Sequence, residues 1–154
     1  MIAKIKELIE IKEMTLSDLN DVYNLEIKVY EYPWSKNILR GCVINKYDCF
    51  IATINKQIVG YLITKISSPE SHILNLTIDK NYRNNGIASQ FLEMVILKCI
   101  LLKSNIIFLE TRLSNLAAIS LYIKFGFNKI GVRKNYYKSK NGRENAVIFS
   151  ISVT

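Results

Sequence analysis

The sequence predicts a mixed α/β fold, in which one sheet carries helices on both faces. Short stretches rich in isoleucine, leucine, valine and aromatic residues are typical of strands, and stretches with helical apolar spacing separate them. The turn signal Asn141-Gly142 lies between the last two strand-like stretches and favours a hairpin. The predicted order is β-α-α-β-β-β-α-β-α-β-β.

The N-terminal region is expected to hold one strand and one helix. Ile5–Met14 alternates loosely between apolar and polar residues, as a strand does. Thr15 and Ser17 are both suitable N-caps for a helix over Leu16–Tyr30, which Pro33 brings to an end.

A second helix and three strands are expected next. Ser35 is a candidate cap for a short helix that runs to about Ile44. Asp48–Ile54 and Ile58–Ile66 are expected to pair as an antiparallel hairpin, and His72–Asp79 is the following strand.

The rest of the chain alternates helices with strands. A long helix is predicted over Gly86–Lys103, followed by a buried strand over Asn105–Thr111. The next helix starts at Ser114 or Asn115 and ends at Phe125.

The long helix carries a broad apolar stripe, which favours a helix that lies flat on a sheet. The stripe consists of Ala88, Phe91, Leu92, Val95 and Cys99, with Ile96 and Ile100 widening it. Two final strands, Phe127–Tyr137 and Arg143–Val153, flank the turn at Asn141-Gly142.

Size and composition favour a single domain spanning residues 1–154. The chain is 49% hydrophobic, and its length allows one substantial core. The formal charge of +8 comes from scattered lysines and arginines, so it reflects composition more than a nucleic-acid surface. Neither a membrane helix nor a secretory signal is visible, so a cytoplasmic location is expected.

Cysteine and histidine usage argues against several kinds of catalytic centre. Cys42, Cys49 and Cys99 form no Cys-x-x-Cys pair, and their odd number suits a reducing compartment. His72 is the only histidine, which argues against a histidine-rich metal site and against a Ser-His-Asp triad. No metal is expected.

The turn before the long helix is a candidate phosphate-binding loop. The first N–H groups of a helix lack helical partners and attract anions. Gly86 allows close backbone approach, Ala88 keeps the first turn open, and Arg83 adds a positive charge. A lone glycine at a helix start is also common as ordinary loop geometry, and the dinucleotide fingerprint is absent.

A carboxylate and a phenol form the candidate catalytic pair. Strand alternation places Glu110 on one face with Ile106 and Phe108, near the end where ligand crevices open in α/β sheets. Such a carboxylate suits a general base, and the alternative is an ordinary ion pair with Arg112 or a lysine. Tyr122, on the next helix, either flanks the same crevice or is a packing tyrosine.

These segments resemble the GCN5-related N-acetyltransferases (GNAT), and most closely the ribosomal-protein alanine N-acetyltransferases (RimI type). Arg83-x-x-Gly86-x-Ala88 is similar to the acetyl-coenzyme A pyrophosphate loop of the superfamily. The narrower matches are Tyr32-Pro33-Trp34-Ser35, Asn75–Asp79, Glu110-x-Arg112-x-Ser114-Asn115, Leu121-Tyr122, Asn135-Tyr136-Tyr137 and Gly142-Arg143-Glu144-Asn145. The pattern departs from the family at Ala88, Lys134 and Asn145, where glycine, arginine and aspartate are usual.

The resemblance implies a fold with two splayed central strands and an enzyme that uses acetyl-coenzyme A. Glu110 would be the general base and Tyr122 the general acid. Acetyl-coenzyme A would be held by Leu76, Thr77, Ile78, Arg83, Asn84, Asn85, Gly86, Ile87, Ala88, Ser89 and Asn115. The acceptor peptide would lie between Tyr32, Pro33 and Trp34 on one side and Tyr136 and Tyr137 on the other.

Two further assignments, besides Glu110 and Tyr122, have a purely structural alternative. Asn115 suits a helix cap as well as a cofactor contact. Pro33 and Trp34 suit an anchor between two helices as well as a wall of the peptide slot.

The implied reaction is direct acetyl transfer in a ternary complex to a protein N-terminal α-amine, in this family the N-terminal alanine of a small-subunit ribosomal protein. Contact with the ribosome is compatible with this function, whereas nucleic acid is not required. Two alternatives stay open. One is an acetyltransferase of the same fold that acts on lysine or a small amine, and the other is a non-catalytic module that binds acetyl-coenzyme A or RNA.

Overall fold

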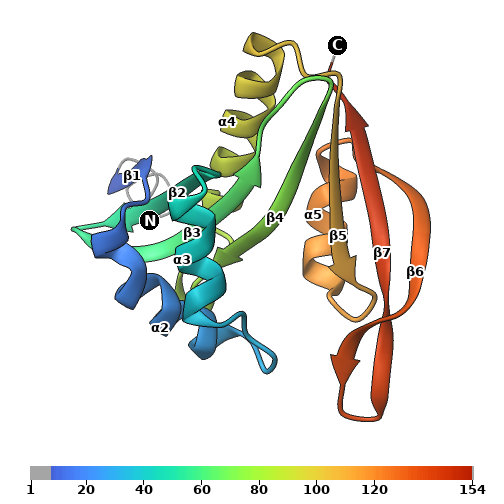
Figure 1. Ribbon diagram of the computed structural model, residues 1–154, viewed down its shortest axis with the longest axis horizontal. Helices are drawn as coiled ribbons and strands as arrows, with labels where there is room; N and C mark the ends of the chain where they lie inside the picture. Colours follow the sequence, from blue (N-terminus) through green and yellow to red (C-terminus); the bar gives the residue numbers. More distant parts are fainter. Residues whose placement is uncertain (1–7, 154) are drawn as a thin grey trace. The chain divides into compact units, whose positions relative to one another are not determined.

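The computed structural model of the chain describes residues 8–153 (Figure 1). Its strands form a seven-stranded mixed sheet in the order β1-β2-β3-β4-β5-β7-β6, with the helices predicted from the sequence between them. The predicted α/β class and order of elements are confirmed. The chain divides into two compact units: residues 1–65 with 75–95, and residues 66–74 with 96–154.

The first unit begins with β1 (Ile9–Glu13), and residues 5–7 of the predicted first strand lie outside the described residues. The helix predicted over Leu16–Tyr30 consists of a 3₁₀ turn, η1 (Leu16–Asp18), and an α-helix, α2 (Leu19–Val29). The Asp18 carboxylate accepts the Thr15 N–H at 2.8 Å, so a local cap fixes the start of the 3₁₀ turn.

Local signals also set the next three elements. In α3 (Lys36–Ile44), the Ser35 hydroxyl accepts the Ile38 N–H at 3.2 Å, as the predicted cap requires. The strands β2 (Asp48–Ile54) and β3 (Gln57–Lys65) form the predicted antiparallel hairpin. Asn55 and Lys56 turn the chain between them with φ values of 50° and 66°.

Neighbouring residues of β3 place α2 and α4 on opposite faces of the sheet in the first unit. Tyr61 donates a hydrogen bond to Glu26 of α2. A Cβ added to the preceding residue, Gly60, would lie 3.6 Å from Phe91 of α4 (Ile87–Leu101). Because successive strand residues face opposite sides, the two helices cover different faces (Figure 1).

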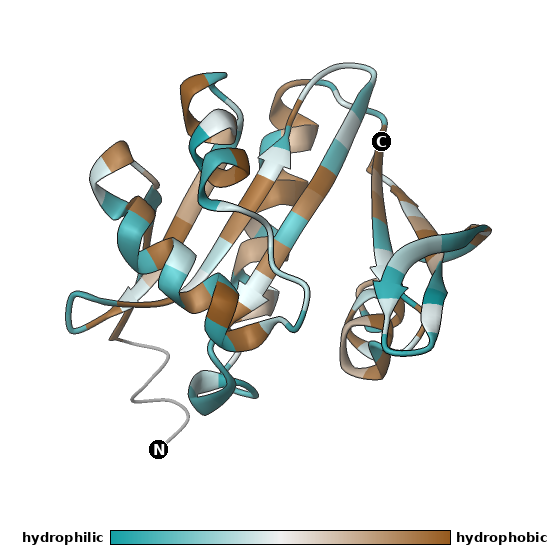
Figure 2. Ribbon diagram, turned by 60° about the horizontal axis from the view of Figure 1, so that its bottom comes forward, coloured by the Kyte–Doolittle hydropathy of each residue, from teal (hydrophilic) through white to brown (hydrophobic). Residues whose placement is uncertain are grey.

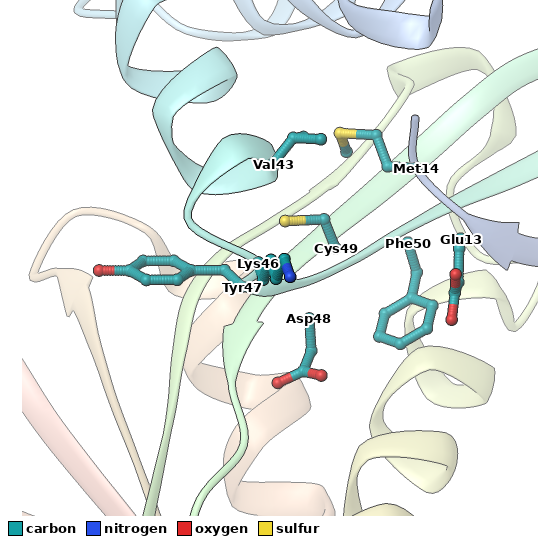
Figure 3. A pocket seen from close by; sticks show the side chains of 8 residues that line it. All are labelled: Glu13, Met14, Val43, Lys46, Tyr47, Asp48, Cys49 and Phe50. Carbon is teal, nitrogen blue, oxygen red and sulfur yellow. The ribbon is translucent and has the colours of Figure 1, made fainter. Parts of the chain in front are cut away.

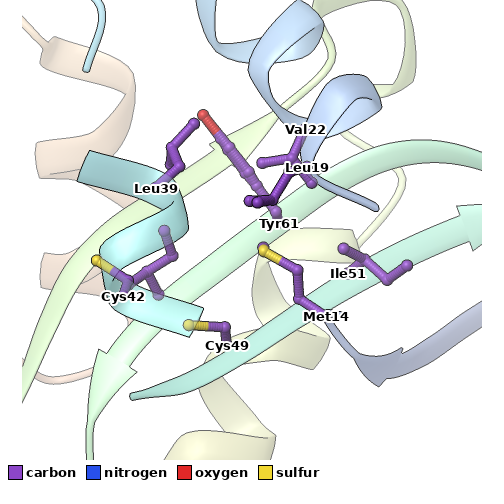
Figure 4. Packing of buried hydrophobic residues seen from close by; sticks show 9 residues of the cluster. Met14, Leu19, Val22, Leu39, Cys42, Cys49, Ile51 and Tyr61 are labelled. Carbon is purple, nitrogen blue, oxygen red and sulfur yellow. The ribbon is translucent and has the colours of Figure 1, made fainter. Parts of the chain in front are cut away.

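The core between α2, α3 and the strands is a cluster of apolar side chains (Figure 4). It contains Met14, Leu19, Val22, Leu39, Cys42, Cys49, Ile51, Tyr61 and Ile63. Hydrophobic residues follow the strands, and the connecting turns are more hydrophilic (Figure 2). Burial of this cluster is the main force that holds the first unit together.

The apolar stripe predicted for α4 is largely confirmed. Phe91, Leu92, Val95 and Cys99 are all buried. The prediction for Ile100 is wrong, because its side chain is 50% exposed. It lies five residues after Val95, about 140° further around the helix axis, and so points away from the buried side.

The second unit is built on β5 (Ile106–Arg112). Residues Glu70–Ile73 of β4 (Glu70–Ile78) pair with β5 in parallel, in a ladder that runs to Ile73 and Leu109. On its other edge β5 pairs antiparallel with β7 (Gly142–Ser152) along its whole length. β5 is therefore a central strand of this unit.

The remaining elements of the second unit are α5 (Leu116–Lys124) and β6 (Asn128–Ser139), which forms a hairpin with β7. Gly142 has a φ of 112°, and the hairpin turn lies at the predicted Asn-Gly position. Gly126, with a φ of 97°, follows the C-cap Phe125 and ends α5 where the sequence predicts.

Candidate functional site

The loop before α4 is shaped by two residues in the left-handed region. Asn84 has a φ of 64° and Gly86 a φ of 82°. The Asn85 side chain donates to the carbonyl oxygens of Tyr82 and Arg83, at 3.0 and 3.1 Å. These bonds fold the loop into a compact turn that leads directly into the helix.

The first turn of α4 presents its backbone amides at this loop. The first hydrogen bond of the helix runs from Gln90 N to Gly86 O at 3.0 Å. The N–H groups of Ile87, Ala88 and Ser89 precede it, so none of them has a carbonyl four residues earlier in the helix to bind. The arrangement fits a phosphate group, as the sequence predicts.

Three charged side chains of the first unit, Lys28, Asp79 and Arg83, hold the beginning of the same loop in place. The Arg83 Nε donates to the Ile78 carbonyl at 3.3 Å. Asp79 accepts the Asn81 N–H at 3.0 Å and the Lys28 ammonium at 3.1 Å. Burial alone would raise the pKa of Asp79, but the hydrogen bonds from Asn81 and Lys28 and the charge of Arg83 together lower it. Asp79 is therefore a negatively charged residue that is held in place at the end of the loop.

The strand residues predicted to bind acetyl-coenzyme A alternate in burial. Thr77 is buried, whereas Leu76 and Ile78 on either side of it are half-buried. The Thr77 hydroxyl donates to the Asn75 side-chain oxygen at 2.7 Å and lies 2.7 Å from the Tyr30 hydroxyl. The orientation of this strand segment is thus fixed from its buried side.

The segment predicted as a peptide wall has one buried attachment. Trp34 packs against the core cluster, and its backbone N–H donates to the Glu26 carboxylate at 2.8 Å. Tyr32 and Pro33 are exposed. This packing favours the anchoring role for Trp34 and leaves Tyr32 and Pro33 accessible.

Glu110 lies on the predicted face of β5. Ile107, Leu109 and Thr111 are buried, and Glu110 on the opposite face has a side chain that is 25% exposed. Its carboxylate forms an ion pair with the Arg133 Nε at 2.7 Å. Glu110 therefore forms an ion pair, as the alternative reading of the sequence predicts, but its partner is Arg133 on β6.

Arg112, the partner considered from the sequence, pairs with Glu144 at 2.9 Å. Glu144 also accepts the N–H and the hydroxyl of Ser114, at 3.2 and 3.1 Å. Burial would raise the pKa of Glu144, but the hydrogen bonds from Arg112 and Ser114 lower it below its usual range. This network joins the end of β5 to β7.

Tyr122 packs inside the second unit. Its side chain is 6% exposed, and its ring lies edge-on to Phe127 with a centroid distance of 5.6 Å. The ring of Phe149 lies 6.2 Å away at a tilt of 45°. The Tyr122 ring therefore has the packing role that the sequence predicts as an alternative.

Asn115 caps α5 through its side chain, which accepts the Ala118 N–H at 3.2 Å. The capping role expected from the sequence is confirmed. The contact to acetyl-coenzyme A is a separate prediction.

Two tyrosines of the β6 hairpin form an aromatic pair flanked by arginines. The rings of Tyr136 and Tyr137 lie edge-to-face with a centroid distance of 4.9 Å. Arg133 lies 5.7 Å from the Tyr136 ring, and Arg112 lies 4.6 Å from the Tyr137 ring. Burial and the charge of Glu110 raise the pKa of Tyr137 to about 12, so its hydroxyl stays protonated at neutral pH.

A bulge in the hairpin makes this grouping. The β6–β7 register shifts between Arg133 and Tyr137, and Asn135 has a φ of 52°. The Asn145 side chain accepts the Asn135 N–H at 3.0 Å and holds the bulge. Arg133 pairs with Ala146 just before this bulge, and its Nε reaches Glu110 across β7, a contact that no local sequence pattern could reveal.

The structure thus brings the predicted residues together in two groups. In the first unit, the loop before α4 contacts the strand Leu76–Ile78 through Arg83, which donates to the Ile78 carbonyl. In the second unit, Arg133 contacts both Glu110 and Tyr136. Sequence reasoning identified none of Glu26, Arg133 and Glu144 as a bonding partner at these sites.

A pocket of about 290 Å³ lies elsewhere in the first unit (Figure 3). Its walls are Glu13, Met14, Val43, Lys46, Tyr47, Asp48, Cys49 and Phe50. None of these is a predicted site residue, so this pocket adds nothing to the acyl-transfer site.

The described residues contain no group of three or more His, Cys, Asp and Glu side chains that is arranged to hold a metal. All three cysteines are buried, and burial raises the pKa of Cys42. Burial, with smaller effects from Cys42 and Asp48, raises the pKa of Cys49 to about 12. These two thiols are poor nucleophiles at neutral pH. In residues 8–153, no helix is long and apolar enough to cross a membrane.

Comparison with known proteins accounts for this arrangement. The sequence model of the acetyltransferase (GNAT) family matches residues 11–127. The chain is 31% identical over 144 residues to the [ribosomal protein bS18]-alanine N-acetyltransferase of Escherichia coli K12, covering 94% of this chain and 97% of that protein. The enzyme of the same name from Haemophilus ducreyi is 32% identical over 142 residues, covering 92% of this chain and 98% of the relative.

Solved structures agree with the sequence relatives. The crystal structure of the ribosomal-protein-S18-alanine N-acetyltransferase from Escherichia coli has a TM-score of 0.88 and 30% identity, covering 95% of this chain and 94% of that one. The structure of Arabidopsis thaliana Naa50 in complex with the bisubstrate analogue CoA-Ac-MVNAL has a TM-score of 0.83 and 22% identity. The match covers 94% of this chain and 99% of that one, and at this identity it supports the fold alone. The chain belongs to the GNAT family of acetyltransferases.

Proposed function

We propose that this chain, acting as one domain over residues 1–154, transfers acetyl from acetyl-coenzyme A to the N-terminal alanine of a small-subunit ribosomal protein. The observation that carries the proposal is the similarity to bS18-alanine N-acetyltransferases, which spans more than nine-tenths of the chain and includes the β6–β7 hairpin. A ribosomal-protein substrate places the activity in the cytoplasm. The reaction needs neither a metal nor nucleic acid.

Acetyl-coenzyme A is the co-substrate, and the first unit supplies most of its binding groups. The amides of Ile87, Ala88 and Ser89 bind the pyrophosphate, supported by the loop Arg83–Gly86. The backbone of Leu76–Ile78, which lies beyond the end of the β4–β5 ladder at Ile73, pairs with the pantetheine arm as an added strand would. In the second unit, Asn115 contacts the cofactor while it caps α5.

Within this site, the Ile78 N–H holds the thioester oxygen as negative charge develops on it. Glu110 takes up the proton that the amine nitrogen loses as the C–N bond forms. The C–S bond breaks, and Tyr122 gives its proton to the departing sulfur. The products are the acetylated N-terminus and free coenzyme A.

The ion pair between Glu110 and Arg133 has a direct consequence for this mechanism. The carboxylate already binds a cationic nitrogen at 2.7 Å, which is the kind of contact that a substrate ammonium group would make. Arg133 must release Glu110 before the carboxylate can receive the amine. An exposed pair of this kind is worth up to about 1 kcal/mol, so a bound peptide can displace it.

Proton availability favours an N-terminal amine as acceptor. With a pKa near 7.7–8.0, roughly a fifth to a third of such amines are neutral near pH 7.4. A lysine with a pKa of about 10.4 is neutral only about 0.1% of the time. A single carboxylate base with no metal therefore suits the α-amine much better.

Two aromatic groups are assigned to the acceptor peptide in this proposal. The first unit contributes Tyr32 and Pro33, with Trp34 as their anchor, and the second unit contributes Tyr136 and Tyr137. Tyr32 and Tyr136 are the exposed aromatic rings of these groups, at 37% and 49%. They provide apolar surface for the first side chains of the peptide.

The test is a panel of short peptides that begin with Ala, Ser, Met or Lys, each prepared with a free and a blocked N-terminus. Initial rates with acetyl-coenzyme A are measured by mass spectrometry. The proposal expects the highest kcat/KM for the free Ala peptides and no acetylation of the blocked ones. Acetylation of lysine side chains in blocked peptides would instead support a lysine acetyltransferase, and binding of acetyl-coenzyme A without any transfer would support a non-catalytic module.

A further inference from the structure

Glu26 is a buried carboxylate in α2 that the proposed reaction does not use. It is 1% exposed, and within residues 8–153 it belongs to none of the ion pairs, which join Lys28 to Asp79, Arg112 to Glu144 and Arg133 to Glu110. A buried carboxylate without a cation must be compensated by hydrogen bonds.

Three donors meet the Glu26 carboxylate. The Trp34 backbone N–H donates to Oε2 at 2.8 Å, and the Asn75 side chain donates to Oε1 at 3.0 Å. The Tyr61 hydroxyl also donates to Oε1, and burial together with the neighbouring Glu26 raises the pKa of Tyr61. Every partner is a donor, so the two carboxylate oxygens accept all three hydrogen bonds.

These bonds connect two segments of the proposed site. Trp34 belongs to the proposed peptide wall, and Asn75 precedes the strand Leu76–Ile78 that we assign to acetyl-coenzyme A. The connection continues beyond Glu26, because the Asn75 oxygen accepts from the Thr77 hydroxyl, which lies 2.7 Å from the Tyr30 hydroxyl. The network therefore leads from the segment before Pro33, through the strand, and back to Trp34.

Stability alone does not explain a carboxylate at this position. Replacing a buried charged group by an apolar residue of similar volume is often neutral or stabilising. An apolar residue would fill the space in α2 equally well, but it could not bind the Trp34 N–H and the Asn75 amide at once. The Glu26 carboxylate binds both segments, Trp34 through Oε2 and Asn75 through Oε1.

We infer that Glu26 is a positioning residue that fixes the Tyr32–Trp34 segment relative to the strand Asn75–Ile78, and so places the first residue of the peptide against the thioester. The inference rests on the function proposed above. Its consequence is a selective one: loss of Glu26 should impair use of the peptide much more than binding of acetyl-coenzyme A.

The test compares Glu26→Met with a matched control, Tyr61→Phe. Glu26→Met removes all three hydrogen bonds at the carboxylate and frees the Trp34 N–H, whereas Tyr61→Phe removes only the Tyr61 bond and leaves Trp34 and Asn75 bound. For Glu26→Met we expect the peptide KM to rise by about tenfold or more, since small misplacements in a site have effects of this size. The dissociation constant of acetyl-coenzyme A, measured by calorimetry, should stay within about twofold of the wild-type value. The variant removes one hydrogen-bond partner of Asn75 but leaves the backbone amides of the loop before α4 unchanged.

Two further measurements separate positioning from general damage. Glu26→Gln keeps an oxygen for the Trp34 N–H and should restore most of the peptide KM. Trp34 is the only tryptophan of the chain, so its fluorescence reports on the segment directly. Quenching of that fluorescence by acrylamide should increase in Glu26→Met and stay at the wild-type level in Tyr61→Phe.

An unchanged peptide KM in a folded Glu26→Met variant would overturn the inference. A parallel loss of acetyl-coenzyme A affinity, or an equal rise in peptide KM in Tyr61→Phe, would overturn it as well, since the role would then be structural. Failure of the wild-type chain to acetylate any peptide would refute the proposed function instead. The fluorescence comparison would still decide whether Glu26 holds the segment.

Discussion

At the residue scale, Glu110 and Tyr122 have different surroundings, which predict different effects of substitution. Glu110 is partly exposed beside Arg133, whereas Tyr122 is packed between Phe127 and Phe149. Phenylalanine can therefore replace Tyr122 with its packing retained, so that the hydroxyl alone is tested.

Glu110→Gln should lower kcat by about 10²-fold or more and flatten its pH dependence, because the proton acceptor is lost. Tyr122→Phe should lower kcat with little change in the affinity for acetyl-coenzyme A, because only the proton donor is lost. Steady-state kinetics across pH, together with calorimetric binding of acetyl-coenzyme A, would measure both. Wild-type turnover by either variant would remove the role assigned to that residue.

Arg133→Met should lower the peptide KM by up to about fivefold, because the guanidinium no longer competes with the substrate ammonium for Glu110 and an exposed pair contributes up to about 1 kcal/mol. The matched control is Arg143→Met, which removes another cation from the same hairpin. The Arg143 guanidinium donates to the Tyr136 carbonyl at 3.2 Å and not to Glu110. A similar change in both variants would mean that net charge, and not release of the carboxylate, sets the peptide affinity.

At the scale of elements, close packing between β3 and β4 fixes the strand assigned to acetyl-coenzyme A. A Cβ on Gly60 would lie 2.8 Å from the Ile78 side chain and 3.0 Å from the Thr77 carbonyl oxygen. Gly60→Ala must therefore displace backbone of the binding strand, since a carbonyl cannot rotate away as a flexible side chain can.

Gly60→Ala should lower the free energy of unfolding by about 1–3 kcal/mol and weaken binding of acetyl-coenzyme A. Gly41→Ala is the control, because its Cβ would meet only the Asn45 side chain at 4.0 Å and it lies within α3. That control should be stabilised by about 0.5–1 kcal/mol. Urea denaturation measures both, and equal effects at the two positions would contradict this packing argument.

The network of Arg112, Glu144 and Ser114 predicts how stability depends on pH. The pKa of Glu144 is lowered in the folded chain, so the unfolded chain binds its proton at higher pH. The stabilisation is complete above the unfolded pKa of about 4.3 and is lost as the pH falls through the lower folded value. Asp79 contributes in the same direction.

Glu144→Gln should therefore cost about 1–2 kcal/mol of unfolding free energy near pH 7, because hydrogen bonds to a charged group are lost. The cost should shrink as the pH is lowered towards 3, since the wild-type carboxylate also becomes neutral. Urea denaturation at several pH values measures this difference. A cost that does not vary with pH would show that the charge of Glu144 is unimportant.

At the scale of the whole molecule, local sequence signals predicted most of the fold. The caps at Ser35 and Asn115, the Asn-Gly hairpin turn and the alternation along β5 all depend on residues a few positions apart. Ile100 was the exception, because a very apolar helix has no sharp boundary between its buried and exposed sides.

The candidate site was predicted less completely, because its decisive contacts join distant parts of the chain. Arg133 is 23 residues from Glu110, and Asn75 is 49 residues from Glu26. The contact between Arg133 and Glu110 depends on the register of β6 against β7 and of β7 against β5. Sequence spacing identifies the carboxylate, but only the folded chain identifies its partner.

The proposed machinery draws on both compact units of the chain. The first unit carries the α4 loop, the strand Leu76–Ile78 and Glu26, and the second carries Glu110, Tyr122 and the aromatic hairpin. The proposed reaction needs both sets of residues on one polypeptide.

The most direct measurement uses a single peptide that carries an N-terminal alanine and an internal lysine, incubated with the wild-type chain and acetyl-coenzyme A. Fragmentation by tandem mass spectrometry then locates the transferred group. We expect one acetyl group, on the α-amine of the alanine. Acetyl on the lysine, or an unmodified peptide, would contradict the account.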